Sequence, residues 1–206
     1  MIEALLAGDT EALRAALAAD PSPATARPDG RRTLLHVLVD WPAHRPNAAA
    51  GVRALVQAGA DVDAPFIGEH AETPLHWAAS ADDLEALDAL LDCGAAIDAP
   101  GAVIGGGTPL DDAWAFGQWR AARRLVERGA RPSLLAAAAL GLPLEGEGDV
   151  TQAFWAACHG GQRAAAEALL ARGADPRRVG FGGRTPEQAA RANGFAELAG
   201  WVAHLP

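Results

Sequence analysis

The pattern of apolar and polar positions in the middle of the chain predicts pairs of short helices. Leucine and alanine recur among acidic residues at helical spacing over residues 83–91. A helix should begin before this segment at Thr73 and Pro74, because a threonine hydroxyl accepts from the free amides of a first turn and proline there loses no useful donor. Ala78 and Ala79 are small enough for a second helix to approach closely. We therefore expect helices that stack on one another.

This pattern recurs at a fixed distance along the chain. Thr108 follows Thr73 by 35 residues, and Gly129 follows Gly94 by the same distance. Self-similarity at such a period is typical of a solenoid, in which no unit buries its own apolar face and neighbouring units do so instead.

Two short stretches relate this repeat to a known family. Residues 73–79 read Thr-Pro-Leu-His-Trp-Ala-Ala, and residues 59–61 read Gly-Ala-Asp. In both stretches the chain resembles the ankyrin-repeat family, as a bacterial-type ankyrin-repeat domain protein, and the resemblance covers nearly the whole sequence. It implies an all-α fold, a solenoid of stacked helix-turn-helix units with finger loops. It also implies motif residues that begin helices, with histidines that hold loops by hydrogen bonds: Thr33, His36, Thr73, Pro74, His76, Thr108, Pro109, Thr185 and Pro186.

We expect one ankyrin-repeat domain over residues 1–206. Its caps should lie at about residues 1–20 and 185–206. A degenerate unit is expected at about residues 133–149, because three glycines and a proline within residues 141–149 do not suit a second helix.

The loops differ in length from one unit to the next. Two prolines within residues 41–47 predict a protruding loop between two helices. The fingers at residues 64–70 and 100–105 are each two residues longer than the last finger, and both carry apolar residues. We expect these enlarged fingers to overhang the inner face of the first helices.

Charge is distributed unevenly along the chain. Residues 1–103 hold 16 acids and 6 arginines, a balance of −10, whereas residues 104–206 hold 10 acids and 11 arginines, a balance of +1. No arginine occurs between Arg53 and Arg120. This predicts a field of one sign in the middle of the solenoid, which repels nucleic acid and favours a basic partner. Ordinary acidic solubility is the alternative.

The sequence predicts a cytoplasmic protein. It contains no apolar run of about twenty residues and no basic leader followed by an apolar stretch, as a membrane helix or a secretory signal would require. Cys93 and Cys158 lie about three stack steps apart, and this exceeds the reach of a disulfide, so we expect two reduced thiols.

No catalytic, metal or cofactor site is complete in the sequence. His70, Glu72 and His76 are close in sequence, but they belong to a finger and a helix, and no further ligand completes a metal site. Cys158 and His159 are adjacent on a predicted helix, which turns their side chains about 100° apart. We expect no metal, no cofactor and no catalytic residue.

Two pairs of residues allow alternative interpretations. Asp111 and Asp112 replace the motif histidine and the next residue in the Thr108 unit. They either stabilise a helix start, by roughly 0.3–1 kcal/mol, or form a polar spot on the inner surface. Trp77 and Trp155 share a motif position, where they either fill the core or contribute to an interface.

These features together predict a non-catalytic protein-binding module that uses its enlarged fingers and an acidic, Trp-containing concave surface. The partner should be a protein with a basic surface, with no nucleic-acid or membrane partner, and the module should be monomeric. The alternatives are an enzyme or a binder of a small cationic ligand in the groove around Trp77, Asp111 and Asp112, or a structural tether. Apolar finger tips would be covered by a partner or by each other. The predicted binding residues are Trp41, Phe66, Glu69, His70, Trp77, Val103, Ile104, Asp111, Asp112 and Trp114.

Overall fold

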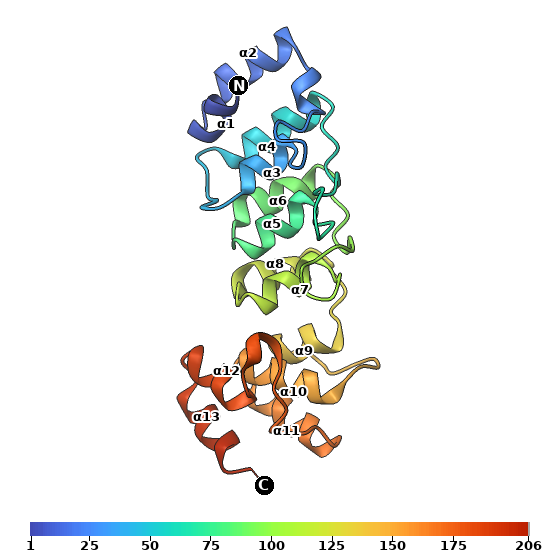
Figure 1. Cartoon of the computed structure of the whole chain (residues 1–206), viewed down its shortest axis with the longest axis vertical. Coiled ribbons are helices and arrows are strands. Elements are labelled where there is room, and N and C mark those ends of the chain that lie inside the picture. Colours follow the sequence, from blue (N-terminus) through green and yellow to red (C-terminus); the bar gives the residue numbers. More distant parts are fainter. Residues whose placement is uncertain (206) are drawn as a thin grey trace. The chain divides into compact units, whose positions relative to one another are not determined.

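The computed structural model describes residues 1–205, and these residues form helices without any strand (Figure 1). They divide into two compact units, Met1–Ala130 and Arg131–Pro206. The first unit contains α1 (Ile2–Ala7), α2 (Thr10–Ala19), the 3-10 helix η1 (Ser22–Ala24), α3 (Leu34–Val39), α4 (Ala48–Gln57), α5 (Pro74–Ser80), α6 (Leu84–Asp92), α7 (Pro109–Ala115) and α8 (Trp119–Glu127). The second contains α9 (Leu134–Leu140), α10 (Val150–His159), α11 (Arg163–Ala171), the 3-10 helix η2 (Phe181–Gly183), α12 (Pro186–Ala192) and α13 (Ala196–Ala203). The predicted all-α fold is confirmed.

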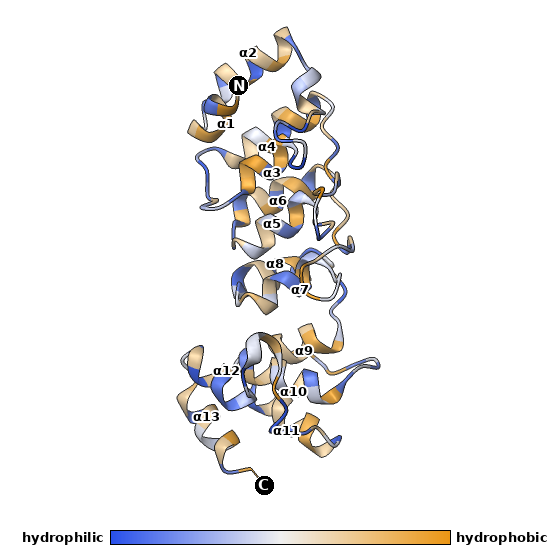
Figure 2. Ribbon diagram, in the orientation of Figure 1, coloured by the Kyte–Doolittle hydropathy of each residue, from blue (hydrophilic) through white to orange (hydrophobic). Residues whose placement is uncertain are grey.

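The helices of the first unit pack in two layers. Helices α3, α5 and α7 contact one another in succession, and so do α4, α6 and α8 (Figure 1). Each helix presents a leucine that is at most 1% exposed to the layer between them, and Figure 2 shows the hydrophobic residues along these helices. Leu75 and Leu110 in one layer are 35 residues apart, as are Leu55, Leu90 and Leu125 in the other, whereas Leu35 precedes Leu75 by 40 residues because of the longer loop between α3 and α4. Since burial of one leucine contributes about 1.5–3 kcal/mol, stability is spread along a row of small cores.

Buried histidines link successive repeats of the first unit. His36 and His76 are both 0% exposed, and the Nδ1 atom of each lies 2.8 or 3.0 Å from the hydroxyl of its capping threonine. Their Nε2 atoms donate to backbone carbonyls of the following finger, at Glu72 (3.1 Å) and Gly107 (3.5 Å). Burial lowers the pKa of each histidine to about 4, so both rings are neutral near pH 7. Each ring therefore joins a helix start to the next loop.

The non-helical segments lie where glycine and proline predict them. Residues 41–47 form turns between α3 and α4, and residues 141–149 contain turns and bends but no helix. In the second unit, α10 packs against α9, α11 and α12. The boundary between the two units directly precedes the expected degenerate unit at residues 133–149. A single domain over residues 1–206 stays a prediction.

Two further sequence-based expectations concern the membrane and the cysteines. Among residues 1–205, no helix has the length and apolar character needed to cross a membrane. Cys93 and Cys158 are both free thiols. Cys158 is completely buried, and this burial raises its pKa to about 12.

Candidate functional site

A groove on the first unit is the strongest candidate for a functional site. It has a volume of about 270 Å³ and is formed by three successive repeats. We call it the Trp77 groove, and its lining consists of Val39, Asp40, Trp41, Glu72, Trp77, Ser80, Ala81, Val103 and Phe116. These residues come from the ends of α3 and α7, from α5 and the residues on either side of it, and from the second enlarged finger, so the stacking of repeats itself assembles the groove.

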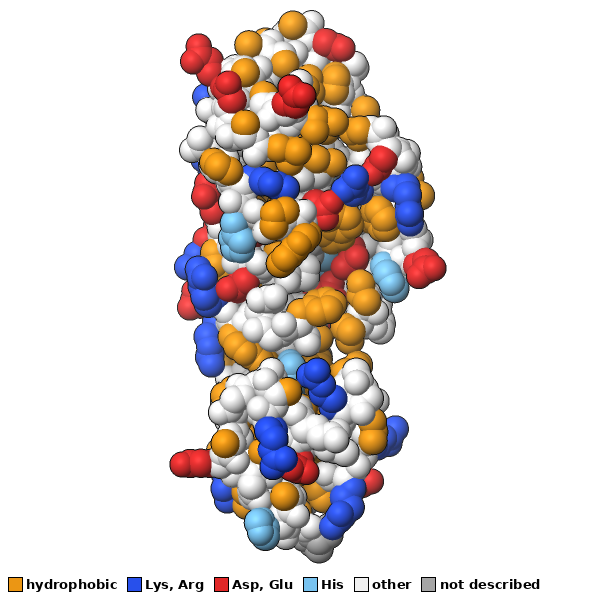
Figure 3. Space-filling view, turned by 60° about the vertical axis from the view of Figure 1, so that its left-hand side comes forward, with side chains coloured by type: hydrophobic (Ala, Val, Ile, Leu, Met, Phe, Trp, Pro, Cys, Tyr) orange, Lys and Arg blue, Asp and Glu red, His pale blue; other side chains and the backbone are white. Residues whose placement is uncertain are grey.

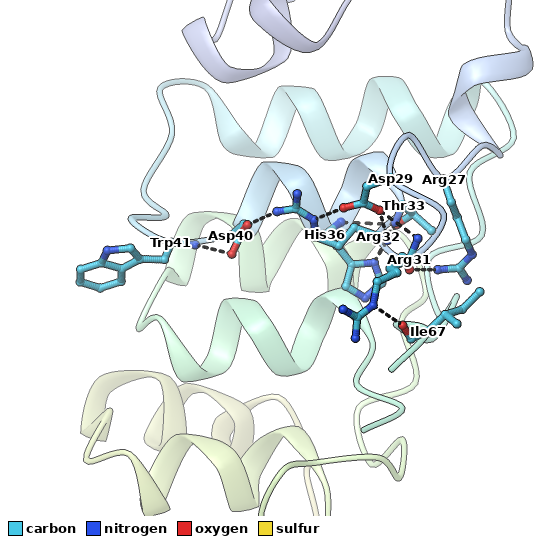
Figure 4. Close-up of polar contacts among 9 residues, drawn as sticks. All are labelled: Arg27, Asp29, Arg31, Arg32, Thr33, His36, Asp40, Trp41 and Ile67. Atoms are coloured by element: carbon cyan, nitrogen blue, oxygen red, sulfur yellow. Dashed lines mark hydrogen bonds and ion pairs between the residues drawn. The ribbon is translucent and has the colours of Figure 1, made fainter. Parts of the chain in front are cut away.

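The walls of the groove expose unusually large apolar side chains. Trp41 is 84% exposed, Phe116 50% and Val103 38%. Figure 4 shows the Trp41 ring extending away from α3, and Figure 3 shows one face of the molecule on which hydrophobic side chains gather beside acidic ones. Apolar side chains gathered at one exposed place are typical of an interaction site.

Glu72 lies at the bottom of the groove, and several hydrogen bonds hold it in place. Its backbone carbonyl accepts from His36 Nε2 (3.1 Å) and from the Phe66 amide (2.7 Å). Its side-chain Oε2 accepts from the Trp77 indole Nε1 (3.2 Å). Glu72 is 8% exposed. The same residue therefore sets the end of the first finger and the orientation of the Trp77 ring.

Asp112, on α7, is 0% exposed and does not line the groove. Its carboxyl group interacts with the Glu72 carboxyl and with the backbone of Ile104. Burial, followed by the charge of the nearby Glu72 carboxyl, raises the pKa of Asp112 to about 8. Near pH 7 Asp112 therefore holds a proton, whereas an exposed aspartate would be ionised.

Contacts within the chain cover part of the finger tips. The Phe66 ring lies 5.4 Å from the Trp77 ring, and the Arg31 guanidinium covers Phe66 at 4.8 Å from its centroid. Arg31 Nε also donates to the Ile67 carbonyl at 2.9 Å (Figure 4). Gly101 of the second finger approaches the first so closely that a Cβ there would lie 2.4 Å from the Ala71 carbonyl oxygen. The two fingers thus pack on each other at this point, while Ile67 remains 53% exposed.

Two acids of α6 pair with arginines in and directly after α8. Arg124 pairs with Asp88, and Arg128 pairs with Asp88 (2.8 Å) and Asp92 (2.6 Å). The expectation of a field of one sign over residues 61–112 therefore needs correction on this outer face. The sequence gap between arginines does not separate the charges in space, because each arginine lies about one repeat beyond its acid.

Asp111 and Trp114 form hydrogen bonds that stabilise α7. Asp111 Oδ2 accepts from the Thr108 amide (2.9 Å), so this acid caps α7 in the manner of the motif histidines. Its Oδ1 accepts from the Trp114 indole (3.1 Å), and Trp114 is 1% exposed. We therefore leave Trp114 out of the site proposed below.

The structure brings together only part of the predicted binding set. Trp41, Trp77 and Val103 line the groove, and the Phe66 ring contacts Trp77 at a tilt without lining the groove. Three predicted residues lie in the fingers outside the groove lining: Glu69, His70 and Ile104.

Six residues of the groove lining were not among the predicted binding residues: Val39, Asp40, Glu72, Ser80, Ala81 and Phe116. Phe116 follows Ala81 by one period of 35 residues, and both end a first helix, so the register offered a signal for this position. Glu72 directly precedes the cap of α5, and nothing in the motif distinguishes it.

A smaller hollow of about 180 Å³ lies in the second unit, lined by Gln152, Trp155, Arg178, Val179, Gly180 and Phe181. Trp155 is 4% exposed there, and its indole donates to the Arg184 carbonyl at 2.8 Å. This hollow has a basic residue in place of the acids of the Trp77 groove. No group of three potential metal ligands occurs anywhere in residues 1–205.

Comparison with protein families supports the repeat assignment. Residues 43–136 match the family described as ankyrin repeats (3 copies). No curated protein matches the chain. The matched segment includes most of the Trp77 groove, and its helices have the paired, stacked arrangement described above. Residues 43–136 are therefore ankyrin repeats, and repeats of this family are generally protein-interaction modules.

Proposed function

We propose that the chain is a non-catalytic binding module that holds a basic segment of a protein partner in the Trp77 groove. The observation that carries this proposal is that the groove has exposed aromatic walls and the acidic side chain of Glu72 at its bottom. The walls would cover apolar side chains of the partner, and Glu72 would attract the partner's positive charge. We further propose that the module acts as a cytoplasmic monomer without nucleic-acid or membrane partners, in keeping with its net charge of −9.

The aromatic residues are expected to supply most of the binding free energy. Tryptophan is enriched among interface hot spots because it buries a large area with little loss of side-chain freedom. Trp41 is free to be covered, whereas Trp77 is already held by Glu72. A partner would therefore order Trp41 and dock against a preformed Trp77 ring.

An enzyme in the same groove is less well supported. A raised pKa in a carboxyl pair is typical of acid–base catalysis. Asp112, however, is 0% exposed and does not line the groove, so a substrate in the groove would not touch it. The volume of about 270 Å³ is also small for a drug-sized ligand, since such pockets usually measure roughly 300–1,000 Å³. The groove is better suited to side chains of a peptide.

The proposal can be tested with an array of short peptides that carry one or two basic residues between apolar ones. We expect binding by the unmodified protein and a loss on the order of 2 kcal/mol for Trp77→Ala. Trp41→Ala should weaken binding with almost no effect on the unfolding temperature, because Trp41 is 84% exposed. Trp201→Ala is the control, since Trp201 packs against Phe154 and Arg163 in the second unit and should affect stability alone.

Unchanged binding by folded Trp41→Ala and Trp77→Ala variants would show that the interaction surface lies outside the groove.

A further inference from the structure

We propose that the hollow of the second unit is a separate binding site, which takes an acidic side chain of a protein partner together with an apolar side chain next to it. We call it the Trp155 hollow, and it is lined by Gln152, Trp155, Arg178, Val179, Gly180 and Phe181. The inference goes beyond the proposed function, because it concerns the other unit and a ligand of opposite charge. No residue of the Trp77 groove takes part in it.

The aromatic part of the Trp155 hollow is preformed. The Trp155 ring stacks on the His159 ring at a centroid distance of 5.1 Å and meets the Phe181 ring edge-on at 5.5 Å. Its indole Nε1 donates to the Arg184 carbonyl at 2.8 Å, and the same carbonyl accepts from the Gly180 amide at 2.9 Å. These contacts fix the ring and the loop together. A ligand would therefore meet apolar surface that needs no rearrangement.

The loop before α12 lies directly on the Trp155 ring. A Cβ at residue 180 would lie 2.6 Å from atoms of that ring, so the loop needs a glycine at this position. Val179 directly precedes Gly180, lines the hollow and is 55% exposed. An apolar side chain of a partner would cover Val179 beside the aromatic rings, and this burial would favour binding.

The side chains of Arg178 and Gln152 supply hydrogen-bond donors to the hollow, and no acid lines it. The guanidinium of Arg178 lies 3.9 Å from Asp149 Oδ2, a distance longer than a hydrogen bond, and both side chains are exposed. The other oxygen of Asp149 accepts from backbone amides at the start of α10, including that of Gln152, so this carboxylate is held as a helix cap. The ion pair with Arg178 is thus a weak, solvent-screened one.

A carboxylate is the group that matches these donors. It accepts two parallel hydrogen bonds from a guanidinium and retains lone pairs for the amide of Gln152. A free anion such as phosphate would also pair with Arg178, but it would leave Val179 and the rings uncovered. The chemistry of the hollow therefore favours a segment that carries an acid next to an apolar residue.

The distribution of charge between the two units supports this choice. Residues 1–130 hold 19 acids and 10 arginines, a balance of −9, whereas residues 131–206 hold 7 acids and 7 arginines, a balance of 0. Residues 175–184, which supply most of the lining, contain three arginines and one aspartate. An acidic segment is therefore attracted to this loop, whereas the charge of the first unit favours a basic one.

The experiment titrates the whole chain with three blocked pentapeptides, Gly-Leu-X-Leu-Gly, in which X is glutamate, glutamine or lysine. Nuclear magnetic resonance follows the indole N–H signals of Trp155 and Trp77, so the two sites are observed separately. We expect the glutamate peptide to shift the Trp155 signal and to bind there roughly fivefold more tightly than the glutamine peptide, because only glutamate forms a charged pair. The lysine peptide should bind most weakly at Trp155. Its effect at Trp77 tests the proposed function alone, so failures of the two proposals are distinguishable.

Two variants assign the binding to the hollow. Arg178→Gln should abolish the preference for glutamate over glutamine. The matched control Arg172→Gln should keep it, because Arg172 is an exposed arginine at the end of α11 outside the lining. Val179→Ser should weaken the glutamate and glutamine peptides by the same factor, since it removes apolar surface and leaves the guanidinium. Arg178 and Val179 are both exposed, so these variants should fold.

The inference is overturned if the glutamate and glutamine peptides bind equally at Trp155, if Arg178→Gln keeps the preference for glutamate, or if no peptide shifts the Trp155 signal. Inorganic phosphate at the same ionic strength is the remaining probe. A shift of the Trp155 signal as large as that caused by the glutamate peptide would also overturn the inference, because it would assign the hollow to free anions. A much smaller shift supports recognition of the acidic segment.

Discussion

Acidification should unfold this protein through two buried histidines. His36 and His76 are 0% exposed, and burial lowers their pKa from 6.5 to about 4. A histidine with a lowered folded pKa contributes stability above pH 6.5 that is lost as pH falls toward 4, because the unfolded chain binds the proton first. At pH 5 the loss is about 2 kcal/mol for each histidine, or about 4 kcal/mol for both. This is a large share of the roughly 5–15 kcal/mol that typically stabilises a folded protein.

Asp112 acts in the opposite direction. Its pKa is raised, so the folded state holds a proton that the unfolded state releases, and its contribution to stability increases as pH falls from about 8. The measured loss in the unmodified protein should therefore be smaller than the sum for the histidines. A comparison of variants removes this offset, because Asp112 is present in both proteins.

The test replaces both histidines by glutamine. Gln188 already fills the equivalent position in α12, where its Oε1 accepts from the Thr185 amide at 2.9 Å, so glutamine suits this site. Urea unfolding followed by circular dichroism at pH 7 and pH 5 should show that His36→Gln/His76→Gln loses about 4 kcal/mol less than the unmodified protein. The same loss in both proteins would refute the assignment of the pH dependence to these rings.

Three further predictions concern the loops, the charge and a helix cap. Amide hydrogens of residues 141–149 should exchange faster than those of α5 and α6, because this mostly exposed segment makes few backbone hydrogen bonds; equal protection by mass spectrometry would contradict this. Peptide affinity should fall between low and high salt, because screening acts beyond a Debye length of about 8 Å at physiological ionic strength, and a flat salt profile would remove the electrostatic role. Asp111→Ala should cost about 2 kcal/mol in urea unfolding, since it loses a cap and a bond to an indole, against about 1 kcal/mol for Gln188→Ala; equal losses would contradict this.

The repeat architecture could be predicted from sequence because it depends on local chemistry. A threonine followed by proline has few structural alternatives to a helix start, and α5, α7 and α12 all begin in this way. The spacing of 35 residues then sets which leucines face the same layer, as with Leu75 and Leu110. Both signals need only a few adjacent residues and a constant period.

The groove could be predicted only in part, because it depends on side chains from three repeats. Asp112 follows Trp77 by 35 residues, so the register places both on the inner side of a first helix. The register does not show that Asp112 is buried and interacts with Glu72 and Ile104, because these contacts depend on how the fingers fold over α7. The pairing of α8 arginines with α6 acids was missed for the same reason, since it requires contacts about one repeat apart.

The position of the motif histidine caps a helix whichever of three residue types occupies it. Histidine, aspartate and glutamine all occupy it in this chain, at His76, Asp111 and Gln188, and each accepts from the backbone amide of its capping threonine. An acid at this position therefore preserves the helix cap and needs no binding role. Asp112 interacts instead with the Glu72 carboxyl and with the backbone of Ile104, so its carboxyl group connects α7 to both enlarged fingers. Of two adjacent acids that look equivalent in sequence, Asp111 therefore caps its own helix, whereas Asp112 contacts the neighbouring loops.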